Sequence, residues 1–335
     1  MKEYKVAIII PTLNEERFIE NCLASVMEQT FPFEEMDVMV VDGGSKDRTR
    51  EIVQRISKNH PNVRLIDNPG RIQSKAFNIG VKASSAPYVM RLDAHATYNN
   101  VYIEKCLKIF SANAESLGCA PELVGNVGGV WNIRPQHSAV IAETSAILNQ
   151  VKFGIGGAAF RVGSKAGLVD TVPFGCFPRN VIEHIGGMRD DLARGEDNEY
   201  NSRIHKAGYK VYLTPEAVCT YFPRDTIYAN IKQMYANGVS IGKLLHIDMA
   251  SVGMRHLVPL AFVLSLLCCF IGGLIYSKFF YILAFILGLY SVACLVATIS
   301  ACIKFGWRYI FTLPMMFFVV HISYGWGTIM GVVKK

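Results

Sequence analysis

Short apolar runs alternate with helical patterns along the front of the chain. Residues 6–10 form a continuous apolar run, typical of a central strand in a parallel sheet, and the largely apolar residues 36–41 form the next predicted strand. Each run is followed by a polar loop and then by apolar residues at helical spacing, at positions 18–26 and 52–56. Strand, loop and helix repeated in this order predict a doubly wound α/β sheet.

Polar residues follow both strands, at the edge where the ligands of such a sheet bind. The loop after the first strand holds Pro11, Thr12, Asn14 and Glu15. Asn14 is predicted to cap the helix that follows. Asp42 ends the second strand, and the glycines after it lack the spacing of a dinucleotide fingerprint or a phosphate loop. An acid in this place more often accepts hydrogen bonds from a ribose or base, with a plain tight turn as the structural alternative.

Candidate groups for a diphosphate and its cation lie between residues 70 and 95. Arg71 and Lys75, at the start of a third predicted helix, can face a diphosphate or remain solvated basic residues. The apolar run at 87–92 ends in Asp93-Ala94-His95. Residues two apart on a strand point to the same side, so Asp93 and His95 can converge on one ion. A carboxylate with an imidazole suits Mg²⁺ or Mn²⁺, and the alternative is a surface turn capped by Asp93.

These motifs, together with one near residue 196, resemble the family-2 glycosyltransferases with the GT-A fold. The resemblance covers residues 4–215, and the motifs stand in family order. The matching stretches are Pro11-Thr12-x-Asn14-Glu15, Val41-Asp42-Gly43-Gly44, Ala76-x-Asn78-x-Gly80, Leu92-Asp93-Ala94-His95 and Gly195-Glu196-Asp197. Asp-Ala-His in place of Asp-x-Asp, with residues 171–177 and a hydrophobic tail, is similar to the succinoglycan-type membrane glucosyltransferases.

The resemblance implies a role for each matching residue. Asp42 would bind the nucleotide base or ribose, and Asp93 with His95 would hold the metal on the diphosphate. The nucleotide-sugar pocket would also be lined by Pro11, Thr12, Asn14, Glu15 and Asn78, with Arg71 added from its position at the start of the third predicted helix. Gln233 resembles a residue of the region that closes over the nucleotide. Asp197 would be the catalytic base, with Glu196 beside it.

A cluster of carboxylates in the first turn of a predicted helix supports the assignment of Asp197 as the catalytic base. Inverting sugar transfer to a hydroxyl needs a carboxylate that accepts the hydroxyl proton, while a metal stabilises the departing diphosphate. Glu196, Asp197 and Glu199 precede apolar positions at helical spacing, and Gly208 ends this helix. The structural alternative is that all three are ordinary helix-start acids, which the helix dipole favours.

Composition divides the chain into a polar front and an apolar tail. Hydrophobic residues make up 51% of the 335 residues, and nearly all the acids precede residue 250. The net charge of +7 comes from scattered Lys and Arg, so we expect no nucleic-acid partner. The nine cysteines include no C-x-x-C pair, which fits a reducing, cytosolic setting.

The tail contains three uncharged apolar segments, at 257–276, 279–303 and 309–333, each long enough to cross a bilayer. We therefore predict a catalytic domain at 1–220, an interfacial amphipathic segment at 221–253 and three membrane segments within 254–335. With the catalytic domain in the cytoplasm, Lys304 and Arg308 lie inside, but the terminal Lys334 and Lys335 would lie outside. Either the last segment is re-entrant or the positive-inside rule is violated here.

These observations predict a metal-dependent, inverting hexosyltransferase of the cell membrane. It would move a sugar from a nucleotide-sugar donor to a lipid-linked, polyprenyl-diphosphate glycan in polysaccharide biosynthesis, with polysaccharide synthesis proteins as further partners. One alternative is a transferase acting on a polyprenyl phosphate, which needs no base. Another is a catalytically silent membrane partner of a polysaccharide synthesis assembly.

Overall fold

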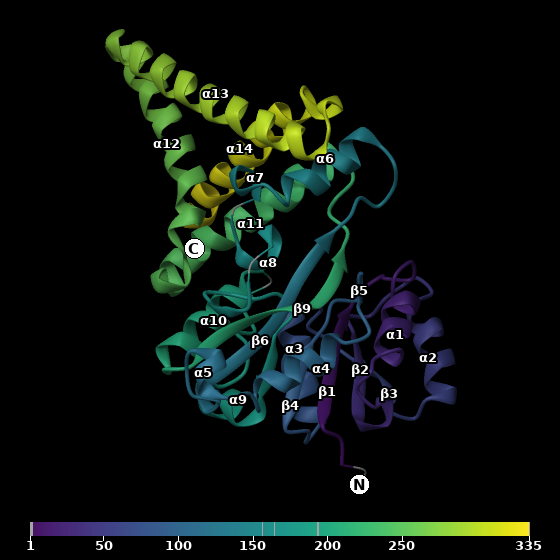
Figure 1. Ribbon diagram of the computed structural model, residues 1–335. Coiled ribbons are helices and arrows are strands. Elements are labelled where there is room, and N and C mark those ends of the chain that lie inside the picture. Colours follow the sequence, from purple (N-terminus) through teal and green to yellow (C-terminus); the bar gives the residue numbers. More distant parts are fainter. Residues whose placement is uncertain (1–2, 156, 164, 193, 335) are drawn as a thin grey trace. The chain divides into compact units, whose positions relative to one another are not determined.

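The computed structural model describes residues 3–155, 157–163, 165–192 and 194–334. The chain forms two compact units, which we describe separately (Figure 1). Unit 1 comprises Met1–Asn132 and Ala159–Tyr221, and unit 2 comprises Ile133–Ala158 and Phe222–Lys335. The functional division at residues 220 and 253 stays a prediction.

Unit 1 is built on one mixed sheet, in the order β3-β2-β1-β4-β8-β6-β9-β5, with β7 paired to β9. The first four of these strands pair in parallel, because their apolar runs are joined by helices. They are β1 (Val6–Thr12), β2 (Met36–Asp42), β3 (Val63–Asp67) and β4 (Tyr88–Arg91). The predicted doubly wound sheet is confirmed in this half.

The other half of the sheet contains antiparallel pairs, which the sequence patterns did not predict. Its strands are β5 (Ala96–Tyr98), β6 (Val124–Ile133), β7 (Gly167–Val169), β8 (Cys176–Pro178) and β9 (Lys210–Tyr221). Strands of three residues carry too little periodicity to be recognised from sequence.

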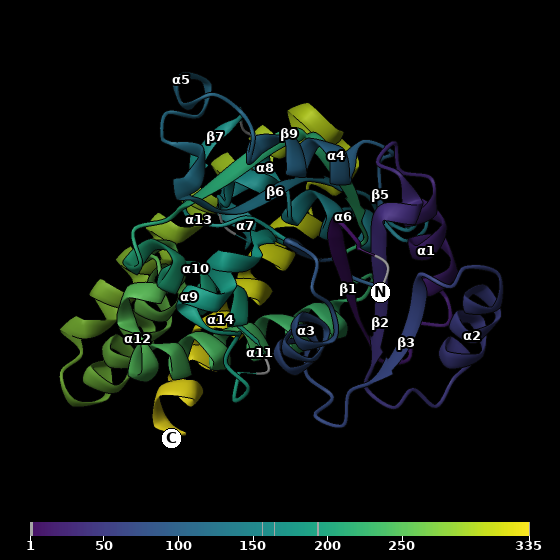
Figure 2. The same ribbon diagram turned by 90° about the horizontal axis from the view of Figure 1, so that it is seen from below.

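Helices cover both faces of the parallel strands (Figure 2). Ile8 and Ile10 belong to the core with the apolar sides of α1 and α2, whereas a Cβ on Gly80 of α3 would meet the Ile9 side chain on the opposite face. The helices of unit 1 are α1 (Ile19–Met27), α2 (Thr49–Asn59), α3 (Gln73–Ala83), α4 (Tyr102–Ile109), α5 (Ala114–Leu117), α8 (Ala159–Val162), α9 (Arg179–Ile185) and α10 (Glu196–Lys206). Short 3₁₀ helices lie at Phe33–Glu35 and Pro121–Leu123.

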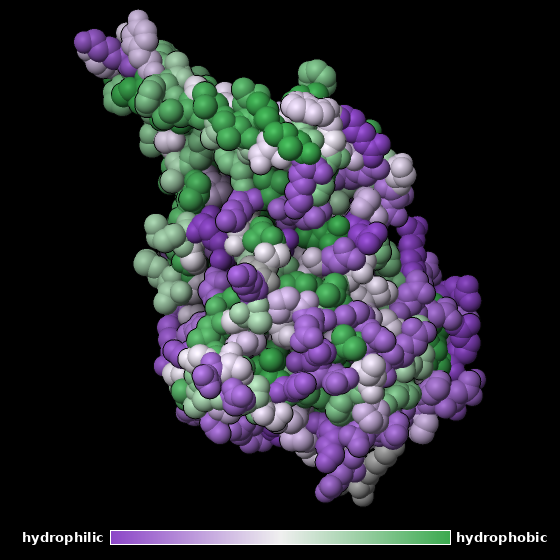
Figure 3. Space-filling model, in the orientation of Figure 1, coloured by the Kyte–Doolittle hydropathy of each residue, from purple (hydrophilic) through white to green (hydrophobic). Residues whose placement is uncertain are grey.

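Unit 2 is helical, and apolar side chains gather over its α12 and α13 (Figure 3). Its helices are α6 (Val140–Leu148), α7 (Lys152–Ile155), α11 (Ile227–Ile247), α12 (Met254–Ile275), α13 (Lys278–Phe305) and α14 (Thr312–Val333), with 3₁₀ helices at Met249–Ser251 and Trp307–Tyr309. Helices α12, α13 and α14 are each long and apolar enough to cross a membrane. Leu148 of α6 and Met234 of α11 share a core with Leu313 and Phe317 of α14.

Candidate functional site

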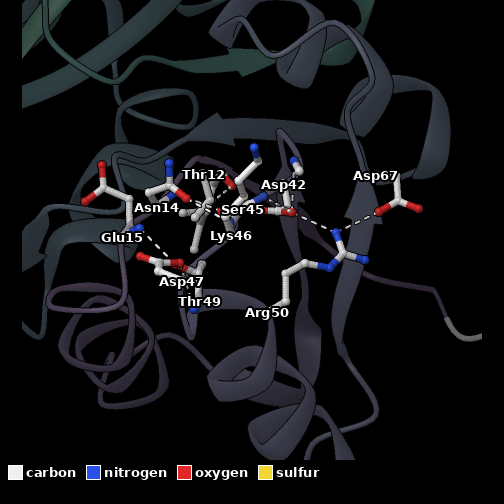
Figure 4. Close-up of polar contacts among 12 residues, drawn as sticks. Thr12, Asn14, Glu15, Asp42, Ser45, Lys46, Asp47, Thr49, Arg50 and Asp67 are labelled. Carbon is white, nitrogen blue, oxygen red and sulfur yellow. Dashed lines mark hydrogen bonds and ion pairs between the residues drawn. The ribbon is translucent and has the colours of Figure 1, made fainter.

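The loops after β1 and β2 are hydrogen-bonded to each other (Figure 4). The backbone N–H of Asn14 donates to Ser45 Oγ at 2.8 Å, and the N–H of Lys46 donates to Asn14 Oδ1 at 2.8 Å. The N–H of Glu15 donates to Thr49 Oγ1 at 2.8 Å. The prediction that Asn14 caps α1 is wrong, since that helix begins at Ile19 without a side-chain cap. Asn14 instead has a left-handed φ of 56°, which Asn tolerates, and its side chain joins the two loops.

Asp42 is buried and enclosed by donors from its own loop and from α2. Its Oδ2 accepts from the N–H of Gly44 at 3.1 Å, the N–H of Ser45 at 3.0 Å and Arg50 Nη1 at 2.7 Å. Its Oδ1 accepts from Ser45 Oγ, and Arg50 also bonds Asp67 at 2.8 Å. Burial by itself would raise the pKa of Asp42, but these hydrogen bonds outweigh it and lower the pKa below its ordinary value. We call these residues the closed cluster.

Asp93 and His95 lie in the loop after β4, which ends at Arg91. Their side chains lie near each other, with 3.9 Å between His95 Nε2 and Asp93 Oδ2, although residues 94 and 95 form a turn and not the predicted strand; Ala94 is buried. His95 Nδ1 is also 3.4 Å from Glu15 Oε1. Asp93 Oδ1 is buried and, among the described residues, has no hydrogen-bond partner.

The donor set fits a divalent cation that is shared with a bound ligand. A buried carboxylate oxygen without a partner, next to an imidazole, offers hard and borderline ligands suited to Mg²⁺ or Mn²⁺. The described residues contain no group of three or more His, Cys, Asp or Glu placed to hold a metal. A cation at Asp93 and His95 would therefore need further ligands from outside this pair of side chains.

Arg91, which sequence reasoning missed, connects this strand end to the helix-start acids. Its Nη1 lies 3.1 Å from Glu196 Oε1, and its Nη2 lies 2.9 Å from Asp197 Oδ2. The Arg91 side chain is 4% exposed, Glu196 7% and Asp197 38%. The sequence did contain a signal for Arg91. It is a cationic residue inside an apolar strand, two residues before Asp93, and a buried charge requires a partner. We call Arg91, Asp93, His95, Glu196 and Asp197 the open cluster.

Burial makes both acids of α10 harder to ionise. Burial and the charge of Asp197 raise the pKa of Glu196 to about 7, although Arg91 opposes the shift. Burial also raises the pKa of Asp197, where Arg91 again opposes and the charge of Asp93 adds to the rise. Solvent moderates the effect at Asp197, since 38% of its side chain is exposed. Asp197 thus combines access with an elevated proton affinity.

Glu199 is engaged elsewhere on the same helix. Its carboxylate oxygens accept from Arg203 Nε at 2.7 Å and Nη2 at 2.9 Å, and its side chain is buried. Both oxygens of this carboxylate are therefore occupied by one guanidinium. Of the three acids at the start of α10, Asp197 is the one that is not buried.

The remaining predicted donor residues have different surroundings. Thr12 is buried and its Oγ1 donates to the Ile10 carbonyl at 3.0 Å, while Pro11 beside it is half-buried. Arg71 is exposed, has a left-handed φ of 59° and lies beside Gly44. The Asn78 amide is bonded to the backbone of Met188 and to Asp190, and Gln233 lies on α11 in unit 2. Their roles in donor binding stay predictions.

An aromatic stack lies next to His95. The Trp131 ring of β6 stacks on Tyr221 of β9 at 4.0 Å, and the Arg161 guanidinium lies 4.3 Å from the Trp131 ring. The Tyr221 and His95 rings are 6.4 Å apart. Within the described part of the chain, the buried Trp131 Nε1 has no hydrogen-bond partner. Tyr221 and Arg161 gave no sequence signal.

Comparisons with known proteins match this architecture. A family model described as glycosyl transferase family 2 matches residues 7–167. The chain is 28% identical over 332 residues to the dolichyl N-acetyl-alpha-D-glucosaminyl phosphate 3-beta-D-2,3-diacetamido-2,3-dideoxy-beta-D-glucuronosyltransferase of Methanococcus voltae, covering 98% of this chain and 97% of that protein. It is 30% identical over 257 residues to the succinoglycan biosynthesis protein ExoA of Rhizobium meliloti, covering 76% and 74%.

A solved structure is similar in fold. The mannosyltransferase PcManGT from Pyrobaculum calidifontis, determined in complex with GDP-Man and Mn²⁺, superposes with a TM-score of 0.59. It is 20% identical, and the match covers 97% of this chain and 88% of that one. This likeness confirms the fold class that the sequence predicted.

Proposed function

Because the chain belongs to the family-2 glycosyltransferases, we propose that it transfers a hexosyl group, with inversion, from a nucleotide sugar to a lipid-linked glycan. Its family and GT-A-type fold make it a glycosyltransferase with a nucleotide-sugar donor, related to proteins of polysaccharide synthesis. The finer assignments of donor residues, metal, base and acceptor are our proposal.

The observation that carries the proposal is the open cluster. The end of β4 brings together Asp93 and His95, a pair suited to a metal, and the partly exposed acid Asp197, which Arg91 contacts. Inverting transfer needs two carboxylates in different environments. One binds a cation, and the other accepts a proton. Asp93 and His95 would hold Mg²⁺ or Mn²⁺, which when bound neutralises charge on the departing diphosphate.

The protein's own residues would then act on the acceptor. A hydroxyl of the acceptor attacks the anomeric carbon, the bond from that carbon to the diphosphate oxygen breaks, and the nucleoside diphosphate leaves. Asp197 accepts the hydroxyl proton, and Arg91 orients that carboxylate through Oδ2. Burial of Arg91 and Glu196 excludes water from one side of the cluster.

Two observations favour a lipid-linked acceptor. The Methanococcus voltae relative, which matches 97% of its own length, is named for a dolichyl-linked sugar phosphate. This chain also has three helices long and apolar enough to cross a membrane, so the catalytic unit would work next to lipid. We propose that it is a multi-pass membrane protein whose catalytic unit faces the cytoplasm and uses a polyprenyl-diphosphate sugar.

The test is a screen of nucleotide sugars with the purified full chain and a lipid-linked sugar acceptor, with and without Mn²⁺. We expect metal-dependent release of nucleoside diphosphate and a glycosylated lipid product. Turnover on a polyprenyl phosphate but on no lipid-linked sugar would favour the first alternative reaction. Absence of turnover with every donor would favour the catalytically silent partner.

A further inference from the structure

The hydroxyl of Tyr98 holds the main chain of Asp93 on both sides. The Asp93 N–H donates to Tyr98 Oη at 2.7 Å, and the Tyr98 hydroxyl donates to the Asp93 carbonyl at 3.2 Å. A phenol keeps its proton at neutral pH, so it can donate and accept together. One side chain therefore satisfies both main-chain groups of the residue that we propose as a metal ligand.

The Asp93 carbonyl has two further partners. The thiol of Cys22, on α1, donates to it at 3.5 Å, and the N–H of Ala96, the first residue of β5, donates to it at 3.3 Å. Tyr98 is the last residue of the same strand. Contacts from α1 and from both ends of β5 therefore fix the main chain at Asp93.

The Asp93 carboxylate is not satisfied in the same way. Its Oδ1 is buried and has no hydrogen-bond partner among the described residues, and the Asp93 side chain is 13% exposed. A buried carboxylate oxygen without a donor or a cation costs free energy, so a mobile loop would turn it toward water. On a fixed main chain the side chain has few staggered positions, and Oδ1 stays where a cation would satisfy it.

Tyr98 is itself anchored in the core of unit 1. Its N–H donates to Ser25 Oγ of α1 at 3.2 Å, and the residue is 5% exposed. The rings of Tyr102 and Phe174 lie edge-on to it, with centroids 4.9 Å and 5.9 Å away. The ring therefore cannot move away from Asp93 without disturbing this packing.

Phe174 supports Tyr98 from a strained backbone position. Its φ is 58°, a left-handed value that a bulky side chain rarely adopts. Such strain persists only where the surroundings over-determine the conformation, and it gathers at functional sites. Phe174 belongs to residues 171–177, a stretch on which part of the family resemblance rests and which has no part in the proposed reaction. Its packing on Tyr98 gives this stretch a task beside the open cluster.

Residues 171–177 contact the elements that lead to both halves of the open cluster. The Gly175 carbonyl accepts from the Arg91 N–H, at the end of β4, at 3.1 Å. Thr171 Oγ1 accepts from Asn201 Nδ2 at 2.9 Å, and all these partners are buried. Asn201 lies on α10, the helix whose first residues are the two acids of the cluster. The stretch thus joins the strand before Asp93 to the acidic helix.

We propose that Tyr98 is a positioning residue of the cation site, whose hydroxyl holds Asp93 so that the carboxylate meets a divalent cation with little rearrangement. The proposal rests on the metal assignment in the proposed function. Tyr98 acts on the cation, and only through it on transfer, because its bonds are to the main chain of Asp93. Phe174 acts through Tyr98, by keeping the phenol ring in place.

Tyr98→Phe isolates the hydroxyl. Phenylalanine keeps the ring beside Tyr102 and Phe174 and removes the partner of the Asp93 main chain. Loss of a residue that orients a metal ligand typically weakens metal binding by about 10- to 100-fold. Other donors still hold the Asp93 carbonyl, so we expect the lower end of this range, a rise of about tenfold in the apparent Kd for Mn²⁺.

Electron paramagnetic resonance measures this Kd, because free Mn²⁺ in water gives a sharp signal that is lost on binding. The purified full chain is titrated with Mn²⁺ in the presence of UDP, GDP, ADP, CDP or dTDP in turn, with a blank of each nucleotide without protein. Tyr102→Phe is the matched control, since it removes a hydroxyl from the same aromatic group while Asp93 keeps its bonds to Tyr98. Asp93→Asn marks complete loss of the site.

Turnover gives a second readout. The rate of Tyr98→Phe should recover when Mn²⁺ is raised by the same factor as the Kd, and the KM for the nucleotide sugar at saturating Mn²⁺ should stay near that of the unsubstituted chain. A general loss of folded protein would instead lower the rate at every Mn²⁺ concentration.

The outcomes separate the inference from the proposed function. An unchanged Kd in Tyr98→Phe, with binding lost in Asp93→Asn, would overturn the inference and leave the metal site in place. Equal losses in Tyr98→Phe and Tyr102→Phe would overturn it too, because the effect would then belong to the aromatic packing. Binding of Mn²⁺ by the unsubstituted chain no tighter than by Asp93→Asn would refute the metal assignment, and the inference with it.

Phe174→Leu decides the question if Tyr98→Phe does not fold. It keeps the hydroxyl and removes the ring that lies against Tyr98. A weaker Kd for Mn²⁺ in Phe174→Leu, restored to a normal rate by added Mn²⁺, would support the inference. An unchanged Kd in this variant would overturn it.

Discussion

The closed and open clusters are both acidic groups at the ends of parallel strands, and they differ in what remains available for a ligand. In the closed cluster, every oxygen of Asp42 accepts from the protein, and its pKa is lowered. In the open cluster, Asp93 Oδ1 is buried without a partner among the described residues, and the pKa of Glu196 is raised to about 7. Position at a strand end is thus not enough to identify a reactive acid.

The two clusters differ in how far the protein's own hydrogen-bond donors occupy the carboxylate oxygens. Ser45 and Arg50 saturate Asp42, so a ribose or base would have to replace one of these donors or bind to the neighbouring backbone. Arg91 contacts one oxygen of Asp197 and leaves the side chain 38% exposed. The closed cluster joins the two loops, and the open cluster is where we propose that a cation and a proton bind.

The largest expected effect follows from Asp93→Asn. This change preserves shape and removes the charge that would hold the cation, so transfer should fall by at least about 10³-fold, the several kcal/mol that a metal contributes. Initial rates of nucleoside diphosphate release at saturating Mn²⁺ measure it. Activity of the unsubstituted enzyme that survives complete chelation would remove the metal from the account.

Asp197→Asn should come next, with a loss in kcat of about 10² or more, because an amide cannot accept the hydroxyl proton. Nucleotide-sugar affinity should stay near normal. Glu199→Gln is the matched control on the same helix, since Arg203 already engages that acid. A normal rate for Asp197→Asn on a lipid-linked sugar would show that the base lies elsewhere, or that the acceptor is an ionised phosphate.

Glu196→Gln probes the raised pKa through stability. Between about pH 4.5 and 7 an unfolded chain has released this proton and the folded chain retains it, so stability falls as pH rises through this window. The loss is on the order of 3 kcal/mol, at 1.36 kcal/mol for each pKa unit. Thermal unfolding of the full chain in detergent should therefore show the unsubstituted protein losing stability relative to Glu196→Gln from pH 4.5 to 7.

The closed cluster should show the opposite sign. Because the pKa of Asp42 is lowered in the folded protein, its ionised form stabilises the fold at pH values above the ordinary pKa of an aspartate. This contribution is lost as the pH falls through the folded-state pKa. Asp42→Asn should therefore resemble the unsubstituted protein more closely in acid than at neutral pH. Identical pH trends for the Asp42 and Glu196 variants would contradict the distinction between the two clusters.

The smallest expected effect is that of Arg91→Lys. Lysine keeps the charge but loses the fork that reaches Glu196 and Asp197 together, so kcat should fall by roughly tenfold through poorer orientation of Asp197. The KM for the nucleotide sugar should change little. Combining Arg91→Lys with Asp197→Asn tests the link, because full additivity of the two losses would mean that Arg91 does not act through Asp197.

The sequence predicted the site best where candidate site residues come directly after a buried strand. Apolar runs located β1, β2 and β4, and so placed Asp42, Asp93 and His95 at one edge of the sheet. Arg91 was missed because its partners are separated from it by more than 100 residues and its function depends on the packing of α10. A local pattern cannot specify such a contact.

Local patterns also failed where tertiary contacts compete with them. Asn14 has the chemistry of a helix cap, but Ser45 and Lys46 of the neighbouring loop bind it instead. Hydropathy identified α14 as apolar but gave no sign of its pairing with α11, because that contact depends on glycine backbones such as Gly238. The segment 133–158 likewise has no hydropathy signal that assigns it to unit 2.

The most direct test of the comparison is calorimetric titration of Mn²⁺ into the full-length protein with a nucleoside diphosphate, for the unsubstituted chain, Asp93→Asn and Asp42→Asn. The open cluster should supply the cation site, so Asp93→Asn should lose the Mn²⁺ dependence of nucleotide binding. Asp42→Asn should keep that dependence, even if its affinity for the nucleotide falls. Loss of Mn²⁺ dependence in Asp42→Asn with retention in Asp93→Asn would contradict the account.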